Sequence, residues 1–164
     1  MKKRIQIYLD TSVINFLFAD DAPQNKELTI ELFDKYIKPG IYQTYISEFV
    51  IAEIEETKSI VKKNKLLAVV ANYTLEMLEL YNKKEIEQLA KKYIATGIIP
   101  AKKFTDALHI AVTVTKNIPY LVSWNYKHLA NINKEQKINA VNIKSGYTNE
   151  LRIITPLELL NDEN

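Results

Sequence analysis

The stretch IQIYLDTSVINF, residues 5–16, decides the fold because it reads as a strand that ends at a carboxylate and passes directly into a helix. Its alternating apolar residues predict a largely buried strand over residues 4–9. Asp10 then stands at the carboxyl end of this strand, the end at which open α/β sheets bind ligands. Asp10 or Thr11 could equally well do no more than cap the following helix. The rest of the chain has to decide between these two interpretations.

The length and composition of the chain are those of one soluble globular domain. Its 164 residues fit a single domain, 1–164, that can bury a sizeable core. The hydrophobic share of 47% and the charged share of 26% are ordinary for such a domain. Because the net charge is only +2, any nucleic-acid binding must come from a local basic patch.

Cysteine is absent from the sequence, which excludes disulfides, zinc–thiolate sites and thiol nucleophiles. Its absence also fits a reducing cytoplasm. The basic N-terminus is followed by too few apolar residues for a signal peptide. No apolar run approaches the roughly 18 residues that a membrane span needs. We therefore expect a cytoplasmic protein that does not enter a membrane.

Turn and cap residues divide the remaining chain into alternating strands and helices. Further strands are predicted over residues 41–46, 120–123, 140–143 and 151–154, while residues 75–80 fit either a strand or a helix. Helices are predicted behind Ser47 and over residues 13–18, 24–37, 58–73, 82–95 and 101–116, with a last turn from Pro156. Capping boxes are expected for Asn82 with Glu85 and for Thr155 with Glu158. This alternation predicts a three-layer α/β/α domain with a mainly parallel central sheet.

Four polar side chains stand just beyond a predicted strand or on the helix that follows one. They are Asp10, Glu53, Asp106 and Asn125. Glu53 has apolar neighbours on its helix, and Asp106 lies on a helix that is largely apolar. A buried acid is expensive unless it is paired or bound to a cation. Because the strands of a parallel sheet end at one edge, these side chains could converge there.

Several carboxylates at one place suit a divalent metal ion. Mg²⁺ takes hard oxygen ligands and keeps several waters, so one or two direct carboxylates suffice while others hold those waters. Such an ion can activate water and stabilise the charge that develops during attack on a phosphodiester. Without a cation, like charges packed together would push one pKa upward.

The motifs of this chain together resemble those of PIN-domain proteins, close to the VapC-like toxins of toxin–antitoxin pairs. The matching stretches are YLDTSVI (8–14), SEFVIAEI (47–54), DALHIA (106–111), LVSWNYKHL (121–129) and ITPLELL (154–160). The resemblance implies a PIN-like fold and a Mg²⁺- or Mn²⁺-dependent ribonuclease. It also implies an RNA substrate, a small antitoxin partner and a homodimer.

By motif position, the resemblance makes Asp10, Glu53 and Asp106 the metal-binding acids. It places Thr11 and Ser12 behind them or in a hydrogen bond to the Asp10 carboxylate. Many PIN domains have Asp where this chain has Asn125, and a neutral amide coordinates metal only weakly through its carbonyl oxygen. An alternative function is therefore a PIN-fold module of weak or no catalytic activity that binds RNA or a protein partner.

Other residues near these positions have a structural and a functional interpretation each. His109, three residues after Asp106, could be a metal ligand, could contact the metal ligands, or could be a half-buried, hydrogen-bonded histidine. Trp124 could stack on a base or pack against the sheet. Basic side chains could contact RNA phosphates or form a solvated face, namely Lys102, Lys103, Lys127 and His128.

Overall fold

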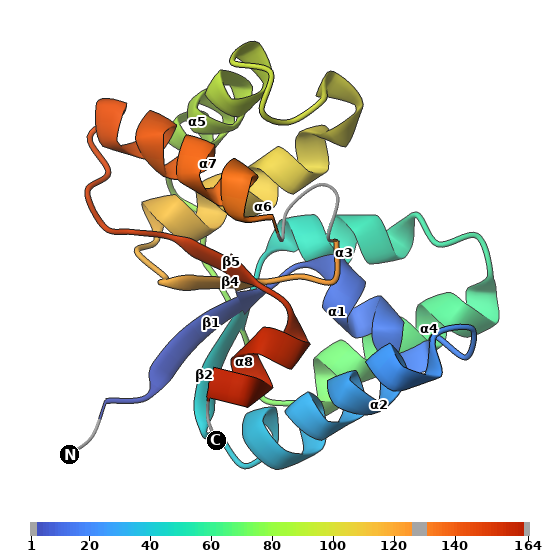
Figure 1. Cartoon of the computed structure of the whole chain (residues 1–164). Helices are drawn as coiled ribbons and strands as arrows, with labels where there is room; N and C mark the ends of the chain where they lie inside the picture. Colours follow the sequence, from blue (N-terminus) through green and yellow to red (C-terminus); the bar gives the residue numbers. More distant parts are fainter. Residues whose placement is uncertain (1–2, 126–130, 163–164) are drawn as a thin grey trace.

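The computed structural model describes residues 3–125 and 131–162, and in these ranges the chain forms one parallel sheet between layers of helices (Figure 1). The sheet has five strands in the order β3-β2-β1-β4-β5, and each neighbouring pair is parallel. The strands are β1 (Ile5–Leu9), β2 (Tyr42–Ile46), β3 (Leu75–Met77), β4 (Tyr120–Val122) and β5 (Arg152–Ile154). The predicted α/β/α architecture with a mainly parallel sheet is thus confirmed.

Helices cover both faces of the sheet. In Figure 1, α5, α6 and α7 lie together on one side, and α2, α4 and α8 lie on the other. The α-helices are α1 (Thr11–Asn15), α2 (Pro23–Glu31), α3 (Glu48–Glu55), α4 (Ile60–Asn72), α5 (Lys83–Ala95), α6 (Phe104–Thr115), α7 (Ile132–Lys144) and α8 (Pro156–Asp162). Two 3₁₀ turns, η1 (Phe16–Phe18) and η3 (Ala101–Lys103), adjoin α1 and α6, and the π-helical segment η2 (Leu32–Ile37) continues α2. In the described ranges, no helix is both long and apolar enough to cross a membrane.

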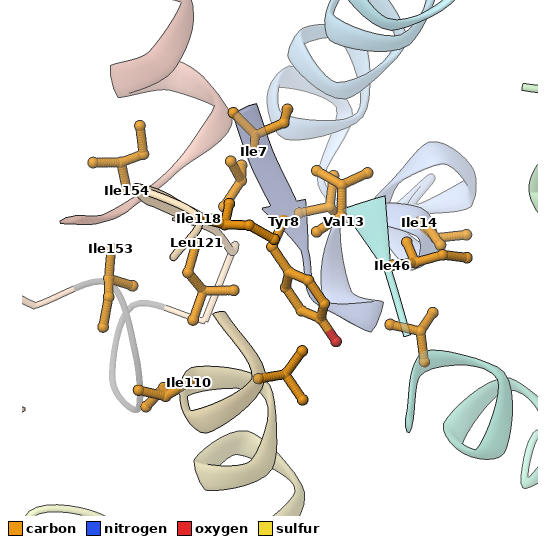
Figure 2. Close-up of a cluster of buried hydrophobic side chains, with 14 of the residues drawn as sticks. Ile7, Tyr8, Val13, Ile14, Ile46, Ile110, Ile118, Leu121, Ile153 and Ile154 are labelled. Atoms are coloured by element: carbon orange, nitrogen blue, oxygen red, sulfur yellow. The ribbon is translucent and has the colours of Figure 1, made fainter. Parts of the chain in front are cut away.

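Strand β1 lies at the centre of the core and is buried on both faces. Ile7 and Tyr8 are each 0% exposed, and they point to opposite sides of the strand in Figure 2, Tyr8 toward α6. A parallel strand covered by helices on both faces needs side chains that can be buried on both sides. The predicted burial of this strand is confirmed from Ile7 onward, whereas Ile5 at its start is exposed. The strand therefore brings its polar-tipped Tyr8 into the interior.

The strand predicted over residues 140–143 is wrong, because these residues belong to α7. The positions that α7 buries are Ile138 and Asn142, which are four residues apart as on one helix face. The hydroxyl of Tyr93 on α5 donates to Asn142 Oδ1 in the interior. Ile143 is instead 63% exposed. Because an asparagine is buried and an isoleucine is exposed, the spacing of apolar residues in this segment does not show the helical period.

The cap predictions had mixed outcomes. The Ser47 side chain accepts from Phe49 N at 3.3 Å, and Thr155 Oγ1 accepts from Glu158 N at 3.2 Å, as expected. The capping box predicted at Asn82 is wrong, since that side chain makes no capping bond to the described amides of α5. Helix α4 begins at Ile60 and not at residue 58, because Ser59 caps it. Residues 75–80, which fitted either element, contain strand β3.

Replacing Ile110 of α6 by Ala should lower the free energy of unfolding by about 2 to 5 kcal/mol, because this side chain is 0% exposed and its removal leaves a cavity. Ile143→Ala is the matched control and should change stability by less than about 0.5 kcal/mol, because an exposed residue loses little packing. Urea unfolding measures both. A loss at Ile143 as large as that at Ile110 would contradict the helical assignment of residues 140–143.

Candidate active site

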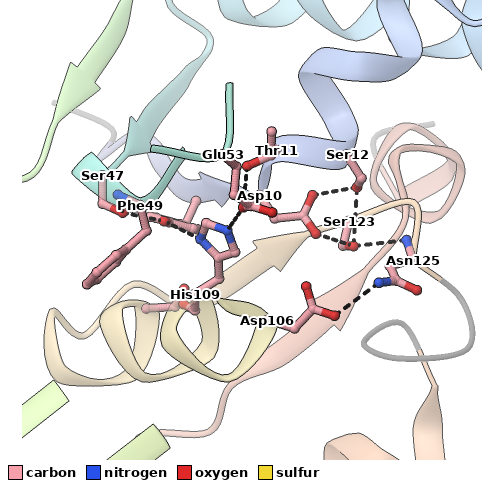
Figure 3. A network of polar contacts seen from close by, with 12 residues as sticks. Asp10, Thr11, Ser12, Ser47, Phe49, Glu53, Asp106, His109, Ser123 and Asn125 are labelled. Atoms are coloured by element: carbon pink, nitrogen blue, oxygen red, sulfur yellow. Dashed lines mark hydrogen bonds and ion pairs between the residues drawn. The ribbon is translucent and has the colours of Figure 1, made fainter. Parts of the chain in front are cut away.

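The Asp10 carboxylate lies where the carboxyl ends of β1 and β4 meet. The register pairs Leu9 with Val122, so that Asp10 and Ser123 follow side by side. Ser123 Oγ donates to Asp10 Oδ2 at 2.6 Å, and Ser12 Oγ donates to Oδ1 at 2.5 Å (Figure 3). Asp10 occupies the N-cap position of α1, but its side chain makes no capping bond to the described amides of that helix. The carboxylate is thus held by two hydroxyls and does not serve as a helix cap.

Burial changes the acidity of Asp10, which is only 3% exposed. Loss of hydration raises the pKa of Asp10 from 3.8 to about 6, and the negative charge of Asp106 acts in the same direction. The hydrogen bonds from Ser12 and Ser123 oppose the increase. The carboxylate therefore ionises at a cost that a nearby cation would offset.

Glu53 projects from α3 and uses one carboxylate oxygen for two hydrogen bonds. Its Oε1 accepts from Thr11 Oγ1 at 2.6 Å and lies 2.5 Å from His109 Nε2. Burial by itself would raise the pKa of Glu53, but the hydrogen bonds from His109 and Thr11 and the charge of Lys103 together hold that pKa below its ordinary value. Among the described residues, Oε2 has no hydrogen-bond partner. Glu53 is thus an anchored anion with one oxygen left for a ligand.

A line of buried polar groups continues from Glu53 into the core. His109 of α6 is 1% exposed, and its Nδ1 lies 2.8 Å from the hydroxyl of Tyr8. The same hydroxyl lies 2.7 Å from Ser47 Oγ at the end of β2. His109 is therefore a fully buried, hydrogen-bonded histidine that also contacts one of the candidate acids.

Asp106 and Asn125 form the third part of the site. Asn125 Nδ2 donates to Asp106 Oδ2 at 3.2 Å, and Asn125 N donates to Ser123 Oγ at 2.9 Å. Because Ser123 also holds Asp10, hydrogen bonds link the two aspartates through Ser123 and Asn125. Burial lowers the pKa of Lys134 on α7, and the charge of Asp106 opposes this change, so a basic side chain lies near the acids.

The structure brings together the four residues that the sequence singled out, in two hydrogen-bonded groups (Figure 3). One group joins Asp10 to Asp106, and the other joins Glu53 to His109. The sequence did not indicate that three further side chains, Tyr8, Ser47 and Ser123, take part in these hydrogen-bonded groups. Ser123 had a usable signal, since it follows β4 as Asp10 follows β1. Tyr8 had only its place as a polar-tipped residue in a buried strand.

Trp124 packs in the interior. It is 4% exposed, its Nε1 donates to Thr29 Oγ1 at 2.8 Å, and its ring lies 5.6 Å from that of Phe16. Of its two interpretations, packing is the one that the structure supports. Lys102 is exposed, while Lys127 and His128 lie outside the described residues.

The donor set suits a hard cation that keeps much of its water. Within the described ranges, no three Asp, Glu or His side chains lie close enough together to hold an ion among them. Mg²⁺ needs only one or two carboxylates when waters complete its shell. Two linked aspartates, one with its pKa raised by burial and by the other's charge, match that requirement.

Comparison with known proteins places the fold. No known family's sequence model matches the chain, and no curated protein matches its sequence. Among solved structures, a chain of VapBC2 from Rickettsia felis, bound to a DNA fragment from the promoter, has a TM-score of 0.54 at 17% identity, covering 92% of this chain and 98% of that one. VapC20 of Mycobacterium tuberculosis, a toxin that cleaves the sarcin–ricin loop, has a TM-score of 0.52 at 16% identity, covering 73% and 89%. The chain thus has the PIN-like fold of VapC structures, and identities this low establish the fold alone.

The stability of Asp10→Asn relative to the metal-free wild type should rise by about 2 to 3 kcal/mol as the pH rises from 3.8 to about 6, which is the free-energy equivalent of the increase in the pKa of Asp10. The folded state holds this proton more tightly than the unfolded chain does. The difference between variant and wild type should therefore change between pH 3.8 and about 6 and be constant below that window. Urea unfolding in chelator at both ends of the window measures it. Asp21→Asn, at an exposed acid, is the control, and an Asp10→Asn effect independent of pH would contradict the role of burial.

Proposed function

We propose that this protein is a divalent-metal-dependent endoribonuclease of the PIN type, the toxin of a toxin–antitoxin pair. The observation that carries the proposal is the meeting of Asp10, Asp106, Asn125 and Glu53 at the carboxyl edge of a parallel sheet with the VapC-like fold. Ligands bind at this edge in open α/β sheets. A divalent cation promotes hydrolysis of an RNA phosphodiester bond, and such a set of acids can hold one in place.

Each residue has a distinct part in the proposed reaction. Asp10 and Asp106 hold Mg²⁺ or Mn²⁺, and Ser12 and Ser123 orient the two oxygens of Asp10. An ion bound there would supply an activated water and stabilise charge on the phosphate. Asn125 orients Asp106 through its amide. Glu53, whose Oε1 is held by Thr11 and His109, would use its second oxygen to orient a water.

Basic side chains beside the acids would bind the RNA backbone. The charge of Lys103 acts on Glu53, and that of Asp106 acts on Lys134, so both lysines lie near the proposed cleavage site. Contacts of this kind supply the part of RNA affinity that falls with salt. The toxin assignment further implies a small antitoxin protein as partner, a homodimer, and action in the cytoplasm.

The second candidate is a PIN-fold module that binds RNA or a protein partner with weak or no catalysis. Two observations favour it. The described residues contain no group of three possible Asp, Glu, His or Cys ligands close enough to share an ion. The fourth candidate position of the site is occupied by the neutral Asn125. The two candidates differ in whether a divalent ion binds at Asp10 and Asp106.

Asp10→Asn should lower the rate of RNA cleavage with Mn²⁺ by at least about 100-fold, because it removes a ligand of the ion. Asp106→Asn should do the same, and Asp21→Asn should cleave at the wild-type rate. The substrates are an rRNA fragment with the sarcin–ricin loop and a single-stranded RNA of mixed sequence. Equal rates in wild type and Asp10→Asn would refute the enzyme, and RNA binding without cleavage or Mn²⁺ binding would favour the second candidate.

Asn125→Asp separates the candidates without an RNA substrate. The new carboxylate replaces an amide that donates to Asp106, so repulsion should lower the melting temperature of the metal-free variant. If a divalent ion binds here, Mn²⁺ should raise the melting temperature of the variant more than that of wild type, because binding to the folded state stabilises it. Thermal unfolding with and without Mn²⁺ measures both. A destabilised variant that Mn²⁺ does not rescue would point to the binding module.

A further inference from the structure

A line of hydrogen bonds between buried side chains leads from the core to Glu53. It runs from Ser47 after β2 to Tyr8 of β1, then to His109 of α6 and Glu53 of α3. Figure 3 labels Ser47, His109 and Glu53. Ser47 and Tyr8 are each 0% exposed, and neither is part of the proposed chemistry. We propose that Tyr8 is a positioning residue, which fixes the tautomer of His109 and through it the orientation of the Glu53 carboxylate. The proposal deepens the proposed function and rests on it.

The direction of the line follows from its first member. Ser47 Oγ accepts from Phe49 N at 3.3 Å, so the lone pairs of Ser47 are partly used and its own hydrogen needs an acceptor. Within the described residues, the oxygen of Tyr8, 2.7 Å away, is the acceptor available to it. The Tyr8 hydroxyl then donates its hydrogen to His109 Nδ1 at 2.8 Å. In this direction each hydroxyl hydrogen has an acceptor.

The opposite direction leaves a buried hydrogen without an acceptor. If His109 Nδ1 carried a hydrogen, it would donate to Tyr8, and Tyr8 would donate to Ser47. The Ser47 hydrogen would then have no acceptor in the described part of the chain, although the residue is 0% exposed. A buried donor without a partner costs free energy. Burial also raises the pKa of Tyr8 far above its ordinary value, so its hydroxyl keeps the hydrogen that it donates.

The consequence for Glu53 is a fixed carboxylate. With Nδ1 accepting, His109 carries its hydrogen on Nε2 and donates it to Glu53 Oε1 at 2.5 Å. Thr11 donates to the same oxygen at 2.6 Å. Two donors on Oε1 restrict the orientation of the carboxylate and leave Oε2 for a water or another ligand. Without the Tyr8 hydroxyl, His109 could place its hydrogen on Nδ1, and the Nε2 lone pair would then face the carboxylate.

The ¹⁵N NMR spectrum of the His109 ring in the metal-free protein tests the inference directly. The chain has two histidines, so a His128→Gln background leaves His109 as the one signal. The expected spectrum has a protonated Nε2 and an unprotonated Nδ1, and Tyr8→Phe should shift it to a mixture of tautomers. Tyr93→Phe, which loses a different buried hydroxyl bond, should leave it unchanged.

Protonated Nδ1 in wild type, or an unchanged tautomer in Tyr8→Phe, would overturn the inference. The wild-type spectrum decides the hydrogen-bond direction even if a variant folds poorly.

Kinetics provide the second test. Tyr8→Phe should lower kcat for RNA cleavage by about tenfold or more with little change in KM, as expected when a partner behind a metal-site residue is removed. Tyr93→Phe should keep the wild-type kcat, and a Tyr8→Phe kcat equal to wild type would overturn the positioning role. If wild type cleaves no RNA, the proposed function fails, whereas the NMR result still decides whether Tyr8 positions Glu53.

Discussion

The burial of the Asp10 carboxylate is the constraint on which the site depends. A carboxylate that has lost its water must be hydrogen-bonded, neutralised or bound to a cation. Two serine hydroxyls, one from each of the neighbouring segments that follow β1 and β4, give it partial compensation. Its pKa nevertheless rises to about 6, which shows that the compensation is incomplete. The remaining electrostatic cost is what makes this position suited to a divalent ion.

The two halves of the site hold their acids by different means. Asp10 and Asp106 are linked by small hydroxyl and amide donors, and the charge of Asp106 disfavours ionisation of Asp10. Glu53 is held by a histidine whose hydrogen bonds continue into the core, and its pKa lies below the ordinary value. The first pair is therefore the part that a cation would stabilise most. Glu53 stays anionic without a cation.

The parallel sheet makes this division possible. Because β1 is central and its neighbours β2 and β4 run parallel to it, Asp10, Ser47 and Ser123 all follow strand ends at one edge. Helix α6 then brings Asp106 and His109 to that edge on the same helical face, three residues apart. The likeness to VapC structures at 16% and 17% identity shows that the same arrangement of elements tolerates extensive change of sequence.

The sequence by itself determined the buried strand that ends at Asp10, the parallel α/β architecture and the four polar positions at the sheet edge, because each depends on local spacing of apolar and polar residues. Only the tertiary structure decided which of these side chains bond to one another. Ser123 and Asp10 are 113 residues apart and Tyr8 and His109 are 101 apart, so no local pattern records their contacts. The same reason explains the error at residues 140–143, where Asn142 is buried because Tyr93 of another helix donates to it. These hydrogen bonds depend on contacts between distant parts of the chain, and not on the local spacing of residues.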